Sequence, residues 1–134
     1  MKNVILTPNP YRDRNFQTMR NAMQILRNAG IQPKLCLPFE VDRNYELPKA
    51  LRFSRLDREL PNAELVICFG GDGTILHSSK IATEHNLPIL GVNIGTMGFI
   101  AELEAGEIEL LRKIPKGDYT VEERTMLDLS LIHI

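Results

Sequence analysis

The sequence predicts an α/β fold in which a Rossmann-like parallel sheet is covered by helices on both faces. Two observations support this prediction. Short apolar runs alternate with helix-length segments along most of the chain, and this alternation is typical of parallel sheets. The short runs are almost continuously apolar, as expected of strands that are buried on both sides. In such a sheet, ligands are expected beyond the carboxyl ends of the strands.

The first predicted unit is a strand, a helix and a second strand. Residues 3–9 form a short β-branched run, which predicts a buried strand. Residues 13–29 predict a helix, with Asp13 as a candidate N-cap and Gly30 as a stop signal. The apolar face of this helix repeats every three or four positions, at Phe16, Met19, Met23 and Leu26. Residues 32–38 predict the second strand.

The middle of the chain predicts two further helix–strand units. Residues 38–48 show no clear period and predict a loop, and a helix is expected over residues 49–60. Residues 63–69 form the most apolar run in the chain, so we expect this strand at the middle of the sheet. Residues 74–86 predict a helix that packs closely on the sheet through small side chains. Residues 87–93 predict the fourth strand.

The pattern changes after the fourth strand. Residues 104–114 predict a short helix. Within residues 118–134, leucines at 127, 129 and 131 alternate with Asp128 and Ser130, which predicts a half-buried strand. Such a strand needs partners, and the sequence offers none after it. We therefore expect this chain to be the front portion of a larger protein.

The composition indicates an ordinary folded domain and limits its partners. The 134 residues are 43% hydrophobic and 25% charged, which suits a globular core. Basic and acidic residues nearly balance, with a formal net charge of -1, whereas a general binder of nucleic acid or anionic membranes would show a basic excess. No nucleic-acid or membrane partner is therefore expected. Local anion binding stays open, because backbone N–H groups can supply it.

The N-terminus and the apolar runs predict a cytoplasmic protein. No apolar run has the roughly 18 residues that a membrane-spanning helix needs. The opening stretch, MKNVILTPNP, has one lysine and is too short in apolar residues for a signal peptide.

The strongest motif is the stretch CFGGDGTILH, residues 68–77. A strand, a glycine loop and a helix N-terminus together expose N–H groups and a positive dipole end, which suits phosphate. The motif matches neither the Walker A loop nor GxGxxG. Asp72 sets the motif apart from a loop that only binds phosphate, because a carboxylate repels phosphate.

Asp72 therefore suggests chemistry rather than simple phosphate binding. A carboxylate at this place can accept a proton or hydrogen bond from a hydroxyl that attacks a phosphoryl group, or it can help to hold Mg²⁺. The alternative is a tight strand-to-helix turn in which Asp72 caps the helix. The five-residue string alone leaves both interpretations open.

Three segments read together resemble the NAD kinase family. GGDGTILH is followed by LGVNIGTMGFIAEL and then by EERTMLDL, in the order and approximate spacing of that family, and the resemblance runs from residue 3 over nearly the whole chain. GGDGT is shared with diacylglycerol and sphingosine kinases and, more loosely, with phosphofructokinases. The GxNxGxxGF pattern that follows it is far more specific to NAD kinases.

The resemblance implies a phosphotransferase. Members transfer the terminal phosphoryl group of ATP, or of polyphosphate, to the 2′-hydroxyl of the adenosine ribose of NAD, which makes NADP. They use a divalent metal, usually Mg²⁺, and full-length members are homodimers or homotetramers. The resemblance does not distinguish ATP from polyphosphate, or NAD from NADH.

The resemblance also implies roles for individual residues. Asp72 would engage the attacking hydroxyl. The phosphate-facing loop would consist of Gly70, Gly71, Gly73 and Thr74. The second loop would consist of Asn93, Gly95, Gly98 and Phe99, with Phe99 against the NAD. Two purely structural alternatives stay open, in which Phe99 is a core aromatic residue and Asn93 terminates a strand.

The sequence departs from the family at its end. NAD kinases continue into a β-rich C-terminal domain with an Asn-Glu motif and a GSTAY-like segment, and neither string occurs here. We expect residues 1–118 to form the α/β nucleotide-binding domain and residues 119–134 to begin a truncated C-terminal domain. Little activity is expected from the 134 residues alone.

Other chemically distinctive side chains carry weaker hypotheses. Cys36 and Cys68 lie in apolar runs, where burial in a reduced protein is favoured over a redox pair or a metal site. His77, His85 and His133 lack metal-ligand spacing, so no zinc site is expected. Four arginines are expected on the polar side of the first helix, where solvation is favoured over contact of one of them with a nucleotide phosphate: Arg12, Arg14, Arg20 and Arg27.

Two other functions compete with the NAD kinase hypothesis. A lipid kinase catalytic domain would share GGDGT, but it should carry an apolar pocket or a basic membrane-facing patch. A non-catalytic module would bind a nucleotide weakly through the glycine loop, or would assemble with a partner through its last strand.

Overall fold

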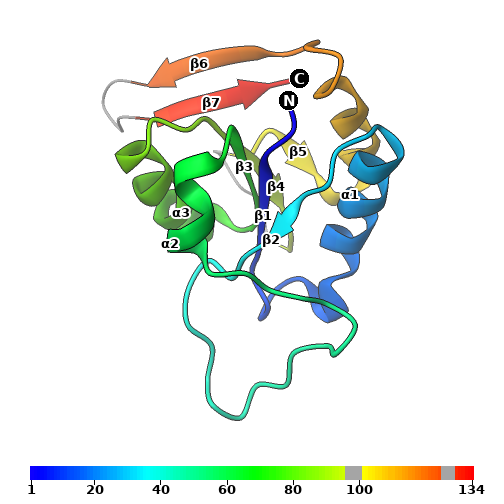
Figure 1. The fold of residues 1–134 in the computed structure, drawn as a ribbon, viewed down its shortest axis with the longest axis vertical. Helices are drawn as coiled ribbons and strands as arrows, with labels where there is room; N and C mark the ends of the chain where they lie inside the picture. Colours follow the sequence, from blue (N-terminus) through cyan, green and yellow to red (C-terminus); the bar gives the residue numbers. More distant parts are fainter. Residues whose placement is uncertain (96–100, 125–128) are drawn as a thin grey trace.

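The computed structural model describes residues 1–95, 101–124 and 129–134. One sheet lies between two layers of helices (Figure 1). Its strands, in chain order, are β1 Val4–Pro8, β2 Lys34–Leu35, β3 Leu65–Gly70, β4 Ile89–Asn93, β5 Leu103–Glu104, β6 Thr120–Arg124 and β7 Leu129–His133. The α-helices are α1 Gln17–Asn28, α2 Leu56–Glu59 and α3 Asp72–Glu84, and the 3-10 helices are η1 Arg14–Phe16, η2 Leu60–Asn62 and η3 Ala105–Lys113.

The sheet is mostly parallel, which confirms the predicted fold class. Its strand order is β2-β1-β3-β4-β7-β6, and β5 pairs with β4. The neighbours from β2 through β4 run parallel, and so do β4 and β7, whereas β6 and β7 are antiparallel. Strand β3 lies inside the sheet between β1 and β4, as its apolar sequence predicted.

Helices cover both faces of the sheet, and each face has its own apolar core. Successive residues of β3 point to opposite faces. Ile67 and Phe69 face the core that α1 and η3 cover. Val66 and Cys68 face the core beneath η2 and α3. In Figure 1, α1 lies on one side of the sheet and α2 and α3 on the other. All six residues of β3 are buried, which explains the uninterrupted apolar run in the sequence.

The predicted helix over residues 49–60 is mostly wrong. The α-helical part is limited to Leu56–Glu59 and continues as the 3-10 turn η2. Upstream, the N–H of Ser54 donates to the carbonyl of Leu35 at 2.7 Å, and Phe53 packs against the apolar core. These contacts with a distant strand hold the segment in a non-helical path.

The first predicted helix begins later than expected. Asn15 and Phe16 have φ angles of 57° and 55°, so the regular α-helix starts only at Gln17. Asp13 still serves the helix terminus, because its carboxylate accepts hydrogen bonds from the N–H groups of Thr18 and Met19 at 3.0 and 2.9 Å. These bonds satisfy donors that a helix N-terminus otherwise leaves open.

Two other elements are shorter or tighter than predicted. The second strand is confined to Lys34–Leu35, extended by a bridge at Cys36. The helix expected over residues 104–114 is the 3-10 helix η3, which opens with a reciprocal capping box between Glu104 and Glu107. No described helix has both the length and the apolar character needed to cross a membrane.

The last described residues form a hairpin that extends the same sheet. Strands β6 and β7 pair antiparallel, and Leu131 of β7 lies opposite Ile89 of β4. Leu131 is buried, as the predicted half-buried strand requires, and Ile132 is buried as well, so both faces of β7 are covered at these two positions. Part of the alternation that predicted this strand, at Leu127 and Asp128, lies outside the described residues. The division into residues 1–118 and 119–134 stays a prediction.

Replacement of Asp13 should measure how much the α1 terminus contributes to stability. Burial raises the pKa of the Asp13 carboxyl above its usual value, against the opposing effect of the backbone donors of Met19 and Thr18. Asp13→Ala should lower the free energy of unfolding by about 1–2 kcal/mol in urea titrations. Asp13→Asn keeps one acceptor and removes the buried charge, so its loss should be smaller. Equal losses in the two variants would contradict this role.

The hairpin should make stability depend on pH through His133. The ring bonds Glu102 through Nδ1 at 2.7 Å and Glu122 through Nε2, and the hydrogen bond to Glu102 is the main cause that raises the His133 pKa above 6.5. A raised histidine pKa stabilises the fold below pH 6.5, and this stabilisation is lost as the pH rises through the folded-state pKa. Urea titrations at pH 6 and pH 9 should show the loss, and His133→Gln should diminish it. An unchanged pH dependence in His133→Gln would refute the assignment.

Candidate functional site

The parallel sheet brings three strand ends to one edge. Pro8 at the end of β1 lies opposite Phe69 of β3, and Gly70 at the end of β3 lies opposite Asn93 at the end of β4. The chain places β2 on one side of β1 and then β3 on the other side. The order of the strands therefore reverses at the boundary between β1 and β3, and open α/β sheets bind ligands outside such a point.

A pocket of about 540 Å³ lies at this reversal point. Its described walls come from the turn after β1, the long loop after β2 and the first turns of α3: Asn9, Arg12, Phe39, Gly71, Asp72, Gly73, Thr74 and His77. The pocket contains four of the five residues of the GGDGT motif and no part of the distant hairpin. The sequence-predicted loop is therefore a wall of an actual cavity.

Gly70 allows the strand and the helix to meet closely. A Cβ atom added at Gly70 would lie 2.9 Å from Cβ of Thr74, a distance at which one side must move. Thr74 is also held from the first strand, since Nδ2 of Asn9 donates to its Oγ1 at 2.9 Å. The side-chain oxygen of Asn9 accepts from the N–H of Tyr11 at 2.9 Å. These contacts fasten the start of α3 to the end of β1.

Asp72 stands at the first position of a long helix. Helix α3 spans thirteen residues from Asp72, and the cap position before it is Gly71, which has an extended backbone and no side chain. Gly71 therefore supplies no side-chain cap, and the helix dipole favours an anion at this end of α3. The Asp72 side chain is partly buried and lines the pocket.

Gly73 is a glycine that the folded chain itself does not require. A Cβ atom added there would have no atom within 4 Å, and its φ is not positive. Glycine in a helix costs stability relative to alanine. Its presence on the pocket wall therefore leaves room for something outside the chain to approach the backbone.

The second glycine segment meets the first at the strand ends. Gly95 has a φ of +99°, a left-handed conformation that favours glycine. Asn93 is buried, and its Nδ2 donates to Glu104 Oε2 at 3.0 Å, while its Oδ1 has no hydrogen-bond partner among the described residues. A buried acceptor without a donor is costly. Gly98 and Phe99, the other two residues predicted for this loop, lie outside the described residues.

The side chain of Arg12 lies close to both glycine segments, a placement that the sequence did not indicate. It lies in the turn after β1 instead of on the polar side of α1. A Cβ atom added at Gly71 would lie 4.0 Å from the guanidinium carbon of Arg12, and one added at Gly95 would lie 3.4 Å from its Nη1. The only available signal was its position a few residues after a predicted strand end.

Phe39 and His77 form the aromatic end of the pocket and were also missed. Their ring centroids are 6.4 Å apart, and Nε2 of His77 hydrogen-bonds the carbonyl of Pro38 at 3.0 Å. Tyr11 stacks on Phe39 with its ring centroid 6.0 Å away. Phe39 belongs to a loop without periodicity, so no sequence pattern could place it beside α3.

The cysteines do not form a reactive centre. Both are buried and free, and burial raises the pKa of Cys36 to about 12 and that of Cys68 to about 11. A thiol with such a pKa stays protonated near neutral pH, and a protonated thiol is a poor nucleophile and metal ligand. Over the described ranges, no three His, Cys, Asp or Glu side chains lie close enough together to hold a metal ion.

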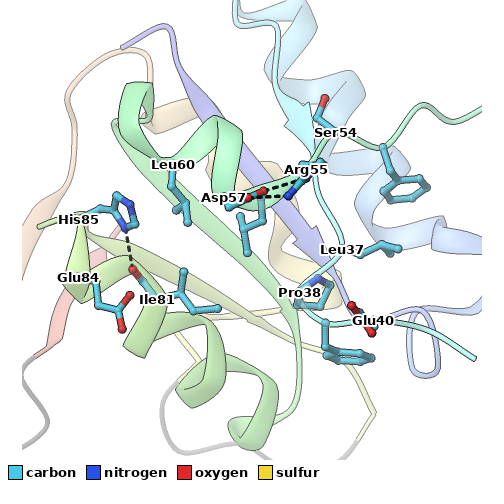
Figure 2. Close-up of a pocket in the computed structure, with 13 residues that line it drawn as sticks. Leu37, Pro38, Glu40, Ser54, Arg55, Asp57, Leu60, Ile81, Glu84 and His85 are labelled. Carbon is cyan, nitrogen blue, oxygen red and sulfur yellow. Dashed lines mark hydrogen bonds and ion pairs between the residues drawn. The ribbon is translucent and has the colours of Figure 1, made fainter.

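A second pocket of about 630 Å³ lies between the long loop after β2 and the helices α2 and α3 (Figure 2). Its floor includes Leu60 and Ile81. The one arginine among its described lining residues forms an ion pair, in which Arg55 Nη2 lies 2.9 Å from Asp57 Oδ2. Glu40 and Glu84 add negative charge to the lining. Apart from Phe39 it shares no described wall with the first pocket. Such a lining does not suit a phosphate group.

Comparisons with known proteins agree on one family. The model of the ATP-NAD kinase N-terminal domain matches residues 4–119. The chain is 33% identical to the NAD kinase of Corynebacterium diphtheriae over 134 residues, covering 97% of this chain and 42% of that protein. It is 46% identical to the NAD kinase of Natranaerobius thermophilus over 71 residues, which cover 52% of this chain and 25% of the relative. The chain thus spans less than half the length of these relatives.

A solved structure has the same fold. The crystal structure of yeast NADH kinase complexed with NADH superposes with a TM-score of 0.69 at 20% identity, over 92% of this chain and 40% of that chain. At this identity the likeness supports the fold alone.

Alanine at two glycines of the loop should have opposite effects on folding. Gly70→Ala should lower the free energy of unfolding by about 1–3 kcal/mol, because its Cβ forces Thr74 to move. Gly73→Ala, the matched control, should leave stability unchanged or raise it by about 0.5–1 kcal/mol. Urea titrations of both variants test the difference. A loss of stability in Gly73→Ala equal to that in Gly70→Ala would contradict the packing described.

Proposed function

Because the chain belongs to the NAD kinase family, we propose that it forms the phosphoryl-transfer half of an enzyme that makes NADP from NAD. The phosphoryl donor would be ATP or polyphosphate, and the acceptor would be the 2′-hydroxyl of the adenosine ribose. One observation carries the proposal: Asp72 lines a pocket at the N-terminus of α3, beside the point where the strand order reverses. The pocket combines a site for anions with a carboxylate for a hydroxyl.

The proposed chemistry divides between backbone and side chain. The N–H groups of Gly71, Asp72 and Gly73 would bind phosphate oxygens, helped by the helix dipole. The carboxylate of Asp72 would accept a hydrogen bond and then the proton of the attacking hydroxyl, which orients the nucleophile. Phosphoryl transfer depends mainly on positioning and charge stabilisation, so this small set of groups suffices for its half of the site.

The donor set fits a magnesium ion held mainly by the substrate. Mg²⁺ in phosphoryl-transfer sites is bound by one or two carboxylates together with substrate phosphates and water. Asp72 is the one carboxylate among the described residues that line the pocket, and it would hold the ion beside the phosphates. When bound, Mg²⁺ neutralises charge on the transferred group.

The second loop would carry the acceptor nucleotide. The Oδ1 atom of Asn93, which no residue in the described part of the chain hydrogen-bonds, is an acceptor for which a ribose hydroxyl would be a suitable donor. Gly95, with Gly98 and Phe99, would complete the contact with NAD, as the family resemblance implies. The family model and the relatives named NAD kinase support NAD as the acceptor.

The proposal treats the chain as part of a larger site. Because it spans less than half the length of its relatives, we expect little turnover from these residues alone. Homo-oligomeric assembly, which the family resemblance implies, and a cytoplasmic location, which the sequence predicts, belong to the proposal.

Formation of NADP tests this function. Purified chain, and the chain completed with a family C-terminal domain, would be incubated with Mg²⁺, NAD and either ATP or polyphosphate. The completed protein should form NADP and the short chain little or none. A lipid acceptor assayed in parallel should stay unphosphorylated. Phosphorylation of the lipid without NADP would reject the proposal in favour of a lipid kinase.

Asp72→Asn separates the catalytic role from binding. The amide keeps the size of the side chain but cannot take a proton, so turnover of the completed protein should fall by about 10²–10⁴-fold. Affinity for the donor nucleotide, measured by calorimetry, should change far less. Comparable turnover of the two proteins would refute a role for Asp72 as base or metal ligand.

A further inference from the structure

Arg12 occupies a rigid turn between two anchored residues. The backbone N–H groups of Arg12 and Asp13 both donate to the carbonyl of Asn9, at 3.1 and 2.9 Å. Asn9 is tied to Thr74 through its side chain, and Asp13 is tied to the first turn of α1. The position of Arg12 is therefore set by the same contacts that join β1 to both helices.

The side chain of Arg12 is available to bind a ligand, although its backbone is held in place. It is exposed, and over the part of the chain that the structure describes it makes no hydrogen bond or ion pair. A guanidinium offers five N–H donors in a planar fork, which suits phosphate oxygens. The guanidinium nevertheless lies beside Gly71 of one loop and Gly95 of the other, rather than extending away from the protein.

A cation at this place would balance negative charge in the pocket. Asp72 carries negative charge on the same wall, and of the described residues that line the pocket Arg12 is the only lysine or arginine. Asp72 would repel a phosphate at the N-terminus of α3, and Arg12 is placed on the same wall to offset that repulsion. The second pocket offers no substitute, because its arginine is paired with Asp57.

We propose that Arg12 binds a phosphate of an oligophosphate ligand and holds it between the Asp72 loop and the Gly95 turn. This inference rests on the proposed function, since it assigns the residue that neutralises the phosphoryl donor. Arg12 would then contact both loops. Its guanidinium would bind the phosphate tail beside the Asp72 loop and would lie against the Gly95 turn, which would carry the acceptor. The ligand class is a chain of phosphates, whether inorganic or attached to a nucleoside.

Arg14 provides a matched control. It is two residues away, exposed, and outside the described lining of the pocket. Arg12→Gln and Arg14→Gln remove the same charge from almost the same place in the sequence. A general effect of net charge would therefore weaken binding equally in both variants, whereas a specific contact would distinguish them.

Calorimetry with inorganic tripolyphosphate and Mg²⁺ tests the proposal on the full 134-residue chain. Arg12→Gln should bind about tenfold more weakly than the unsubstituted chain, Arg14→Gln should bind nearly as well, and Arg12→Lys should fall between, since it keeps the charge and loses the fork. Added salt should weaken binding by the unsubstituted chain more than by Arg12→Gln. The thermal midpoint of unfolding should be nearly the same for both glutamine variants, because the Arg12 side chain makes no hydrogen bond or ion pair with the described residues.

Equal binding by Arg12→Gln and the unsubstituted chain would overturn the inference, as would equal losses in Arg12→Gln and Arg14→Gln. Absence of tripolyphosphate binding by the unsubstituted chain would overturn it as well. The two proposals fail separately. Arg12-dependent binding, with no NADP from the completed protein, would support this site and reject the proposed reaction. NADP formation by the completed protein, with tripolyphosphate binding that does not depend on Arg12, would support the proposed reaction and reject this site.

Discussion

The parallel register of β1, β3 and β4 is the constraint on which the rest of the structure depends. It aligns Pro8 with Phe69 and Gly70 with Asn93, so the segments that follow these strands must leave the sheet at the same edge. The register is itself held by burial on both faces, because a slip of one residue would exchange the side chains of the two cores. The pocket is thus a consequence of how the core packs.

Rigidity at this edge comes from a few polar contacts rather than from the loops themselves. Asn9 joins the end of β1 to Thr74 at the start of α3, and Gly70 permits the close approach that this bond needs. The same region holds unfavourable features. Asn15 and Phe16 have positive φ angles, and Asn93 has a buried oxygen that no described residue hydrogen-bonds. Each such feature costs about 1–3 kcal/mol, and the surrounding packing offsets the cost.

The two pockets illustrate how a nearly neutral chain can separate its charge. The formal net charge is -1, yet the pocket at the strand ends has an uncommitted arginine and a helix N-terminus, while the pocket shown in Figure 2 has a paired arginine and an acidic rim. Only the first of these environments favours an anion. Net charge is a property of the whole chain, so it does not report on a site of this size.

The sequence by itself determined the elements whose signal is local: the buried strands, α1, α3 and the position of GGDGT between a strand and a helix. Continuous apolar runs and helical spacing depend on neighbours within a few residues, so they survive without tertiary information. Tertiary structure decided the rest. The segment before Leu56 is held by strand contacts instead of forming a helix, the last residues pair with β4 as part of a hairpin, and Arg12 and Phe39 reach the pocket from separate segments. Contacts between residues far apart in the chain govern these features, and no short-range pattern encodes them.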